Sequence, residues 1–275
     1  MRWRDLRSSG SMDDRRGIGG KVVGGGVVGI IGIVIYLIMG GDPQQAIKQF
    51  QNQGQTTPLS AEEKAEQDSL AQFSDKVFGS TEDVWHQLLP NRYKEPTLVL
   101  FTGQVQTACG GASSASGPFY CPGDDQVYID LSFFQEMAAK FGAAGDFAQA
   151  YVIAHEVGHH VQNILGKSEW MQSQRGSLSE TDYNKLSVKL ELQADFYAGV
   201  WAHHAQKMKN ILDPDDIDEA LNAASAIGDD RLTKGQVSPD NFTHGTSAQR
   251  QYWFKKGFDT GDINQGDTFS DPSLN

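Results

Sequence analysis

Residues 150–166 read AYVIAHEVGHHVQNILG, a stretch whose hydrophobic side chains recur at helical intervals. Asp146 before this stretch can cap a helix, and Gly166 at its end is typical of a helix exit. The sequence therefore predicts a helix over residues 147–165. This helix carries the strongest chemical pattern in the chain.

The pattern is HExxH, from His155 to His159. Two histidines at positions i and i+4 lie on one face of a helix and can reach one metal ion, and Glu156 can face a water that this ion binds. Zinc in hydrolases has three protein ligands and keeps one position for water, so a third ligand has to come from elsewhere. The alternative interpretation is that both histidines are ordinary polar residues on a half-buried helix.

A third ligand is available in residues 189–199, which read KLELQADFYAG. Glu191 and Asp195 are again four positions apart, so one can bind the metal while the other accepts a hydrogen bond from a ligand histidine. Carboxylates in so apolar a segment need a partner, and a metal ion provides one. The alternative is a solvated stripe on the helix.

The remaining segments indicate an α+β fold dominated by helices, with a small β-sheet. Two short β-rich runs, TLVLFT at 97–102 and QVYIDL at 126–131, are the best strand candidates. Capping, proline and periodicity signals predict helices elsewhere, with a polar connection at 167–178 and an irregular tail after Asp259. The other predicted helices cover residues 73–89, 133–141, 179–209, 213–228 and 247–258.

The chain has two cysteines, Cys109 and Cys121, which enclose a loop rich in Gly, Ser and Ala. In an oxidising compartment we expect them to form a disulfide, worth roughly 2 to 4 kcal/mol. A metal site is the rival interpretation, but the sequence has neither a CxxC spacing nor a second cysteine pair. Two free thiols are the remaining alternative.

Several motifs, in their order along the chain, resemble the neutral zinc metallopeptidases of bacterial envelopes, and the resemblance covers nearly all the chain. It implies a zincin-like metallopeptidase domain with one Zn²⁺ per chain, bound by His155, His159 and Glu191. It also implies that Glu156 is the catalytic base and that Asp195 orients a ligand histidine. The motifs are YC…VYID, AHEVGHHVQ, LELQADFYAGVW, AIGDDRL and HGTSAQRQYWFKKGF.

His244, in the segment FTHGTSAQR, is a candidate hydrogen-bond donor to the oxyanion that forms during hydrolysis. The segment enters the last predicted helix, and related HExxH enzymes carry a His-then-Arg element near the metal. Arg250 can then position His244. A purely structural capping role for His244 is an equal alternative.

Charge and hydropathy divide the N-terminal part of the chain. Residues 1–21 hold six basic and three acidic side chains, whereas residues 22–41 are uncharged and long enough to cross a bilayer as one helix. A cleaved signal peptide fits less well because the run lacks a small-x-small cleavage site, and a core helix would rarely contain so many glycines. The sequence predicts a cytoplasmic tip (1–21), a transmembrane helix (22–41), a polar spacer (42–70) and a zinc metallopeptidase domain (71–275).

The positive-inside rule places the N-terminus in the cytoplasm and the domain outside it. With the resemblance to bacterial envelope proteins, we expect a single-pass protein of the bacterial inner membrane with a periplasmic, extracytoplasmic domain. Gly25 and Gly29 form a GxxxG pair through which such helices can associate into homo-oligomers, although chance explains the pair better in so glycine-rich a run. The net charge is −12 despite the basic tip, so no broad cationic surface for nucleic acid is expected.

The function predicted from these features is a membrane-anchored peptidase that cleaves peptide or protein substrates, with Glu156 as general base. One alternative is a membrane-tethered binding or scaffold protein with a structural, non-catalytic zinc site. Another is zinc-dependent hydrolysis of a bond other than a peptide.

Overall fold

The structure is a computed structural model that describes residues 1–17 and 60–274. Its sheet has the strand order β1 (Met12–Asp14), β2 (Thr97–Phe101), β6 (Gln126–Asp130) and β5 (Phe119–Cys121). β1, β2 and β6 are parallel, and β5 runs antiparallel to β6 at one edge. A separate hairpin pairs β3 (Gln104–Thr107) with β4 (Gly110–Ser113). Both predicted strands are confirmed, as the adjacent β2 and β6.

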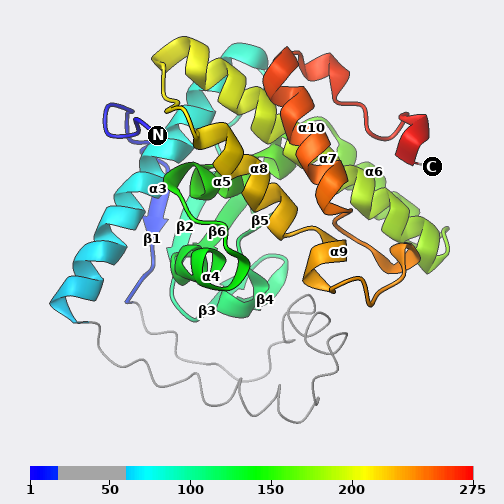
Figure 1. Cartoon of the computed structure of the whole chain (residues 1–275), viewed down its shortest axis with the longest axis horizontal. Helices are drawn as coiled ribbons and strands as arrows, with labels where there is room; N and C mark the ends of the chain where they lie inside the picture. The colour runs from blue at the N-terminus through cyan, green and yellow to red at the C-terminus, as the bar shows by residue number, and fades with distance from the viewer. Residues whose placement is uncertain (18–59, 275) are drawn as a thin grey trace, which may run out of the picture.

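Helices surround this sheet and make up most of the described chain, which confirms the helix-dominated α+β class (Figure 1). The α-helices are α3 (Ala61–Leu88), α4 (Ser132–Phe141), α5 (Asp146–Ile164), α6 (Lys167–Gln174), α7 (Glu180–Lys209), α8 (Asp216–Ala226), α9 (Asp229–Leu232) and α10 (Ser247–Thr260). Short 3-10 turns lie at Ser114–Ser116, Pro239–Asn241, Ile263–Gln265 and Pro272–Leu274.

α5, the helix that carries HExxH, lies in the core and packs against α3, α7 and α8. Phe147, Tyr151 and Val157 on this helix are fully buried. At Gly158 the helix approaches α7 closely, since a Cβ there would lie 2.9 Å from the carbonyl oxygen of Ala194. The absence of a side chain at Gly158 therefore lets the two helices with the predicted ligands come together.

The boundaries on either side of the HExxH helix differ from the predictions. α5 has Gly145 at its N-cap and Asp146 as its first residue, because the Asp146 carboxylate binds the amino group of Met1 instead of capping. The predicted polar connection after α5 contains the helix α6, which starts directly after the left-handed turn at Gly166 (φ 81°).

α3 begins at Ala61, inside the segment predicted as a spacer. Ser60 and Glu63 form a reciprocal capping box that starts the helix. The first turns of α3 are exposed, so the apolar pattern becomes visible in the sequence only from Ala71 onward. The predicted end of the spacer at residue 70 therefore marks where α3 becomes buried and not where the helix begins.

The predicted transmembrane helix, residues 22–41, lies outside the described residues. None of the described helices is long and apolar enough to cross a membrane. Residues 1–17, predicted as part of a separate tip, instead pack against the domain: β1 pairs with β2, and the amino group of Met1 lies 2.6 Å from Oδ1 of Asp146. This packing is the largest difference from the sequence prediction. It arises because basic groups of the tip meet acidic groups of the domain.

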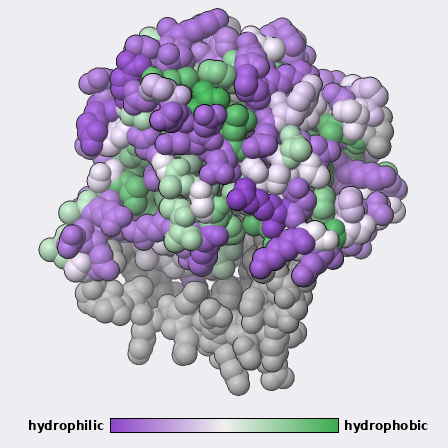
Figure 2. All heavy atoms as spheres, in the orientation of Figure 1, coloured by the Kyte–Doolittle hydropathy of each residue, from purple (hydrophilic) through white to green (hydrophobic). Residues whose placement is uncertain are grey.

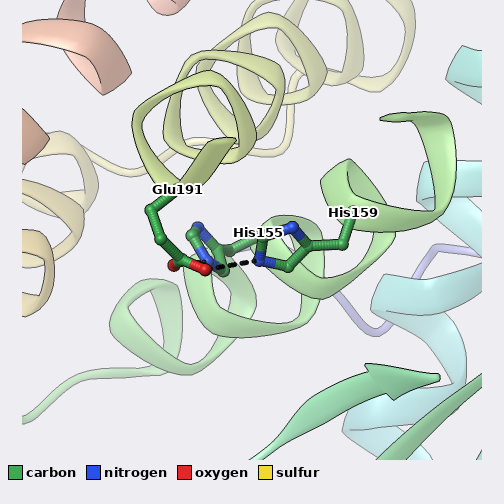
Figure 3. Close-up of side chains that lie close together, drawn as sticks. All are labelled: His155, His159 and Glu191. Atoms are coloured by element: carbon green, nitrogen blue, oxygen red, sulfur yellow. Dashed lines mark hydrogen bonds and ion pairs between the residues drawn. The ribbon is translucent and has the colours of Figure 1, made fainter. Parts of the chain in front are cut away.

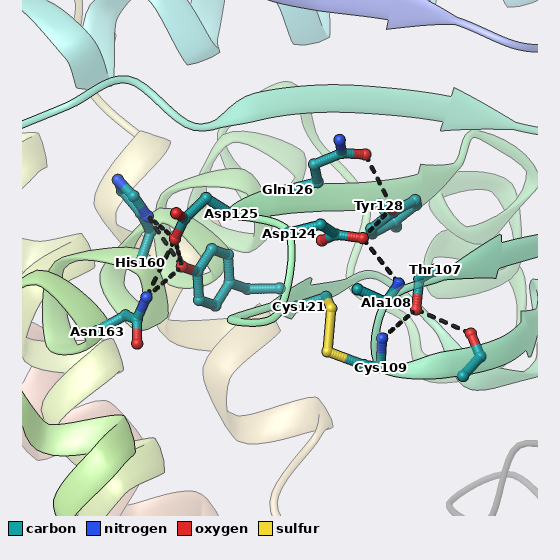
Figure 4. Close-up of a disulfide and its surroundings, with 12 residues drawn as sticks. Thr107, Ala108, Cys109, Cys121, Asp124, Asp125, Gln126, Tyr128, His160 and Asn163 are labelled. Carbon is teal, nitrogen blue, oxygen red and sulfur yellow. Dashed lines mark hydrogen bonds and ion pairs between the residues drawn. A yellow bond between two sulfur atoms is a disulfide. The ribbon is translucent and has the colours of Figure 1, made fainter.

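Cys109 and Cys121 form the predicted disulfide (Figure 4). It joins the turn between β3 and β4 to the end of β5, where Cys121 is fully buried. The hairpin is therefore tied covalently to the edge of the main sheet.

Hydrophilic side chains predominate on the face of the molecule in Figure 2, and hydrophobic ones form small separate patches. This distribution agrees with the net charge of −12.

Candidate metal centre

Three side chains from two helices converge on one point (Figure 3). His155 and His159 project from α5, and Glu191 projects from α7. Nε2 of His155 lies 3.2 Å from Oε2 of Glu191, and Nε2 of His159 lies 3.3 Å from Oε1 of the same carboxylate. One ligand atom of each residue lies within 4.8 Å of the others. Two imidazole nitrogens and a carboxylate oxygen form a donor set that zinc accepts, so these residues fit a zinc ion.

Each imidazole is oriented by a hydrogen bond at its other nitrogen. Nδ1 of His155 lies 2.8 Å from Oδ1 of Asp195, and Nδ1 of His159 lies 2.9 Å from Oε1 of Gln162. Both Nε2 atoms are thereby left for a metal ion. Gln162 also donates to the carbonyl of Leu190 at 2.7 Å, next to Glu191. Sequence reasoning missed Gln162, whose only signal is its position three residues after His159.

Asp195 lies in a fully buried network behind His155. Arg250 on α10 donates from Nε to Oδ2 of Asp195 at 2.8 Å and from Nη2 to Oδ1 at 2.9 Å. The hydroxyl of Tyr151 donates to Oδ1 at 2.5 Å. The sequence suggested Arg250 as a partner of His244, but its strongest contacts are with Asp195. Charge pairing and complete hydrogen bonding are what allow a carboxylate to be buried here.

The three side chains of the cluster shift one another's pKa. Burial lowers the pKa of His155, but the neighbouring Asp195 and Glu191 outweigh it and raise this pKa to about 10. Burial raises the pKa of Glu191, but the two histidines outweigh it and hold this pKa well below its usual range. Because ligand imidazoles must be neutral, zinc binding has to displace protons and weakens in acid.

A cleft of about 560 Å³ opens beside the three converging side chains. Glu156 lines this cleft, although its residue is only 8% exposed. The walls come from α5, α6 and α7, from Phe119 and Tyr120 of β5 with the preceding Pro118, and from the segment that holds His244. The candidate base therefore faces the same space as the candidate ligands.

His244 lines the cleft and is paired with Asp229. Nδ1 of His244 lies 3.1 Å from Oδ1 of Asp229, and Oδ2 of Asp229 accepts the backbone N–H groups of Thr243, His244 and Gly245. Burial lowers the pKa of His244, but the hydrogen bond to Asp229 and the charge of Glu191 outweigh it and raise this pKa above 6.5. The pairing favours a charged imidazole that can donate into the cleft.

The edge strand β5 is held against α5 by a polar cluster around Tyr120. Figure 4 labels three other members of this cluster, Asp125, His160 and Asn163. The Tyr120 hydroxyl donates to Asp125 at 2.6 Å and accepts from Asn163 at 3.0 Å, and Nδ1 of His160 lies 3.1 Å away. His160 also binds the carbonyl of Lys94 at 2.7 Å through Nε2. His160 therefore lies behind the site and does not join the ligands. The tyrosine gave no chemical signal in the sequence.

The chain is similar to a family of zinc proteins and to bacterial relatives. The model of the family described as "Putative neutral zinc metallopeptidase" matches residues 1–269. "Uncharacterized protein YpfJ" of Escherichia coli (strain K12) is 44% identical over 294 aligned residues, which cover 98% of this chain and 99% of that protein. "Uncharacterized protein Rv2575" of Mycobacterium tuberculosis (strain ATCC 25618 / H37Rv) is 48% identical over 209 residues, 71% of this chain and 69% of that protein. No solved structure shows a significant match.

Proposed function

The chain belongs to the neutral zinc metallopeptidase family, and on this premise we propose that it hydrolyses peptide bonds at the cleft beside His155, His159 and Glu191. The observation that carries the proposal is the convergence of two imidazoles and one carboxylate on the wall of an open cleft. One Zn²⁺ held there would polarise a substrate carbonyl and acidify a water molecule.

The side chains around the site have distinct roles in this proposal. Glu156 takes the proton from the attacking water and delivers it to the leaving amine, which is the work of a general base and then a general acid. His244 uses Nδ1 to hold Asp229 and donates from Nε2 to the oxyanion. Asp195 and Gln162 keep the two ligand imidazoles in place.

The substrate is a peptide in extended conformation that lies along β5. This strand pairs with β6 on one side only, and Phe119 and Tyr120 line the cleft. An exposed strand edge offers backbone donors and acceptors to an incoming peptide, which is a common mode of peptide recognition. Cleavage of peptides or unfolded segments therefore suits the site better than cleavage within a compact fold.

The structural-zinc scaffold is the weaker candidate. A structural site is closed by four protein ligands, whereas a catalytic site has three and keeps one position open. Among the described residues, the group of candidate ligands here has three members, and these members line the cleft.

The test is hydrolysis by the full-length chain of a complex peptide mixture, read by mass spectrometry. We expect cleavage that a chelator abolishes and added Zn²⁺ restores. We expect Glu156→Gln to lower kcat at least about 100-fold while still binding one zinc ion. Glu169→Gln, an exposed change on α6, is the matched control. Equal rates for wild type and Glu156→Gln on every peptide would refute the peptidase and favour the scaffold.

A further inference from the structure

We infer that residues 1–17, here called the N-terminal strap, are part of the same folded unit as residues 60–274, and that both lie on the same side of any membrane the protein meets. The inference does not depend on catalysis. It rests on the contacts between the strap and the domain, which are backbone pairing, close packing and ion pairs.

The strap supplies one strand of the main sheet. Met12, Asp13 and Asp14 pair in parallel with Leu98, Val99 and Leu100 of β2. The backbone N–H of Arg15 continues the ladder with a bond of 2.8 Å to the carbonyl of Leu100. β2 is buried, so without β1 its polar backbone edge would lose its partners.

Helix α3 is shaped to receive the strap. Gly79 faces the strap, where a Cβ would lie 2.8 Å from the carbonyl oxygen of Arg7 and 2.9 Å from the nitrogen of Ser9. At another point of α3, the Trp3 ring packs edge-on against Phe73 at 5.5 Å between ring centroids. A side chain at position 79 would displace the strap, so the sequence of α3 is adapted to its presence.

Three arginines of the strap, Arg2, Arg7 and Arg16, have acidic partners in the domain. Arg7 lies 2.8 Å from Glu82, which is 1% exposed, and 2.7 Å from Asp83. Arg16 lies 3.2 Å from Asp68. These arginines belong to the basic group from which the positive-inside rule predicts a cytoplasmic N-terminus. In the structure they are instead used in folding.

The C-terminal end of the strap lies close to the start of α3, where the domain begins. Arg16 donates to the carbonyl of Gln67 at 2.8 Å, within the first two turns of α3. Figure 1 shows β1 running beside α3. One helical crossing between residues 17 and 60 would put about 30 Å of hydrocarbon between these contacts. The pairing of β1 with β2 then could not form.

The topology can be tested by cysteine labelling of the full-length chain in a bacterial host. Ser8→Cys on the strap and Ser177→Cys on the domain, both exposed positions, are made separately. A membrane-impermeant maleimide is applied to intact spheroplasts and to lysed ones, with the wild-type chain, whose cysteines form a disulfide, as the background. We expect the two positions to be labelled alike in spheroplasts, both accessible or both protected. Labelling of one position with protection of the other overturns the inference.

A charge swap tests the docking itself. Arg7→Asp and Asp83→Arg are each expected to lower the thermal midpoint of the purified full-length chain, and the double variant is expected to recover part of the loss. Lys140→Asp with Glu136→Lys, an exposed pair on α4, provides the comparison. Strictly additive effects at positions 7 and 83 would contradict the contact.

Discussion

Nδ1 of His155 lies 2.8 Å from Oδ1 of Asp195, and this contact links a candidate zinc ligand on α5 to a buried carboxylate on α7. Asp195 is itself held by both Nε and Nη2 of Arg250 on α10. The orientation of the imidazole therefore depends on three helices, α5, α7 and α10.

Arg250→Gln removes the counter-charge of a buried carboxylate. We expect zinc affinity to fall about 10- to 100-fold, as for other residues that orient metal ligands. The free energy of unfolding should fall by about 3 to 5 kcal/mol, as when one partner of a buried ion pair is removed. Competition with a chromogenic chelator and denaturant unfolding measure the two effects. Lys255→Gln on the same helix breaks an exposed pair with Asp259 and should change neither. A folded Arg250→Gln variant with wild-type zinc affinity would contradict the role of this network.

The His244–Asp229 pair predicts an alkaline limit of activity. The pKa of His244 is raised above 6.5, so its charged form persists above that pH and is lost as the pH rises through the raised value. Asp229→Asn keeps the shape of the partner but removes its charge, so the alkaline limb of kcat/KM should move to lower pH. His244→Ala should lower kcat by about 100- to 1000-fold, as for other oxyanion donors. Profiles of kcat/KM against pH check this; the same alkaline limb in wild type and Asp229→Asn would count against it.

Tyr120→Phe should impair substrate binding more than chemistry. The Tyr120 hydroxyl forms hydrogen bonds with Asp125 and Asn163, and these bonds hold β5 in place. β5 is the strand along which we expect the peptide to bind. Losing these hydrogen bonds should raise KM roughly 5- to 10-fold, which corresponds to about 1 kcal/mol or slightly more, with little change in kcat. Steady-state kinetics on one defined peptide measures this. Tyr128→Phe removes a hydroxyl from β6, outside the residues that line the cleft, and serves as the control. A loss confined to kcat would show that Tyr120 acts in some other way.

Opening the disulfide should loosen the attachment of the β3–β4 hairpin to β5. Cys109→Ser with Cys121→Ser is expected to lower the free energy of unfolding by roughly 2 to 4 kcal/mol, the usual worth of a short closed loop. Thermal or denaturant unfolding under non-reducing conditions measures the change. Reduction of the wild type should reproduce it, and reduction of the double variant should do nothing. Equal stability of oxidised and reduced wild type would contradict a stabilising role.

The sequence by itself determined the local features of this protein. The helical spacing of hydrophobic side chains in residues 147–165 predicted α5, and the β-rich runs predicted β2 and β6. Ser179 with Asp182 marked the start of α7. These features depend on residues that are close neighbours in the sequence, within one helical turn or one strand. They can therefore be predicted from the sequence alone. The spacing of His155 and His159, and of Glu191 and Asp195, belongs to this class too.

Only the tertiary structure decided which distant groups meet. Gln162 and Tyr151 have no motif of their own, and they matter because α7 packs against α5 and brings the carbonyl of Leu190 and the carboxylate of Asp195 to them. The strap is the clearest case. Its charge and the uncharged run after it predict a separate tip, whereas its partners, Phe73, Gly79 and Glu82, lie far along the chain. Contacts of such large sequence separation leave no periodic signal, because either partner alone looks like an ordinary surface or core residue.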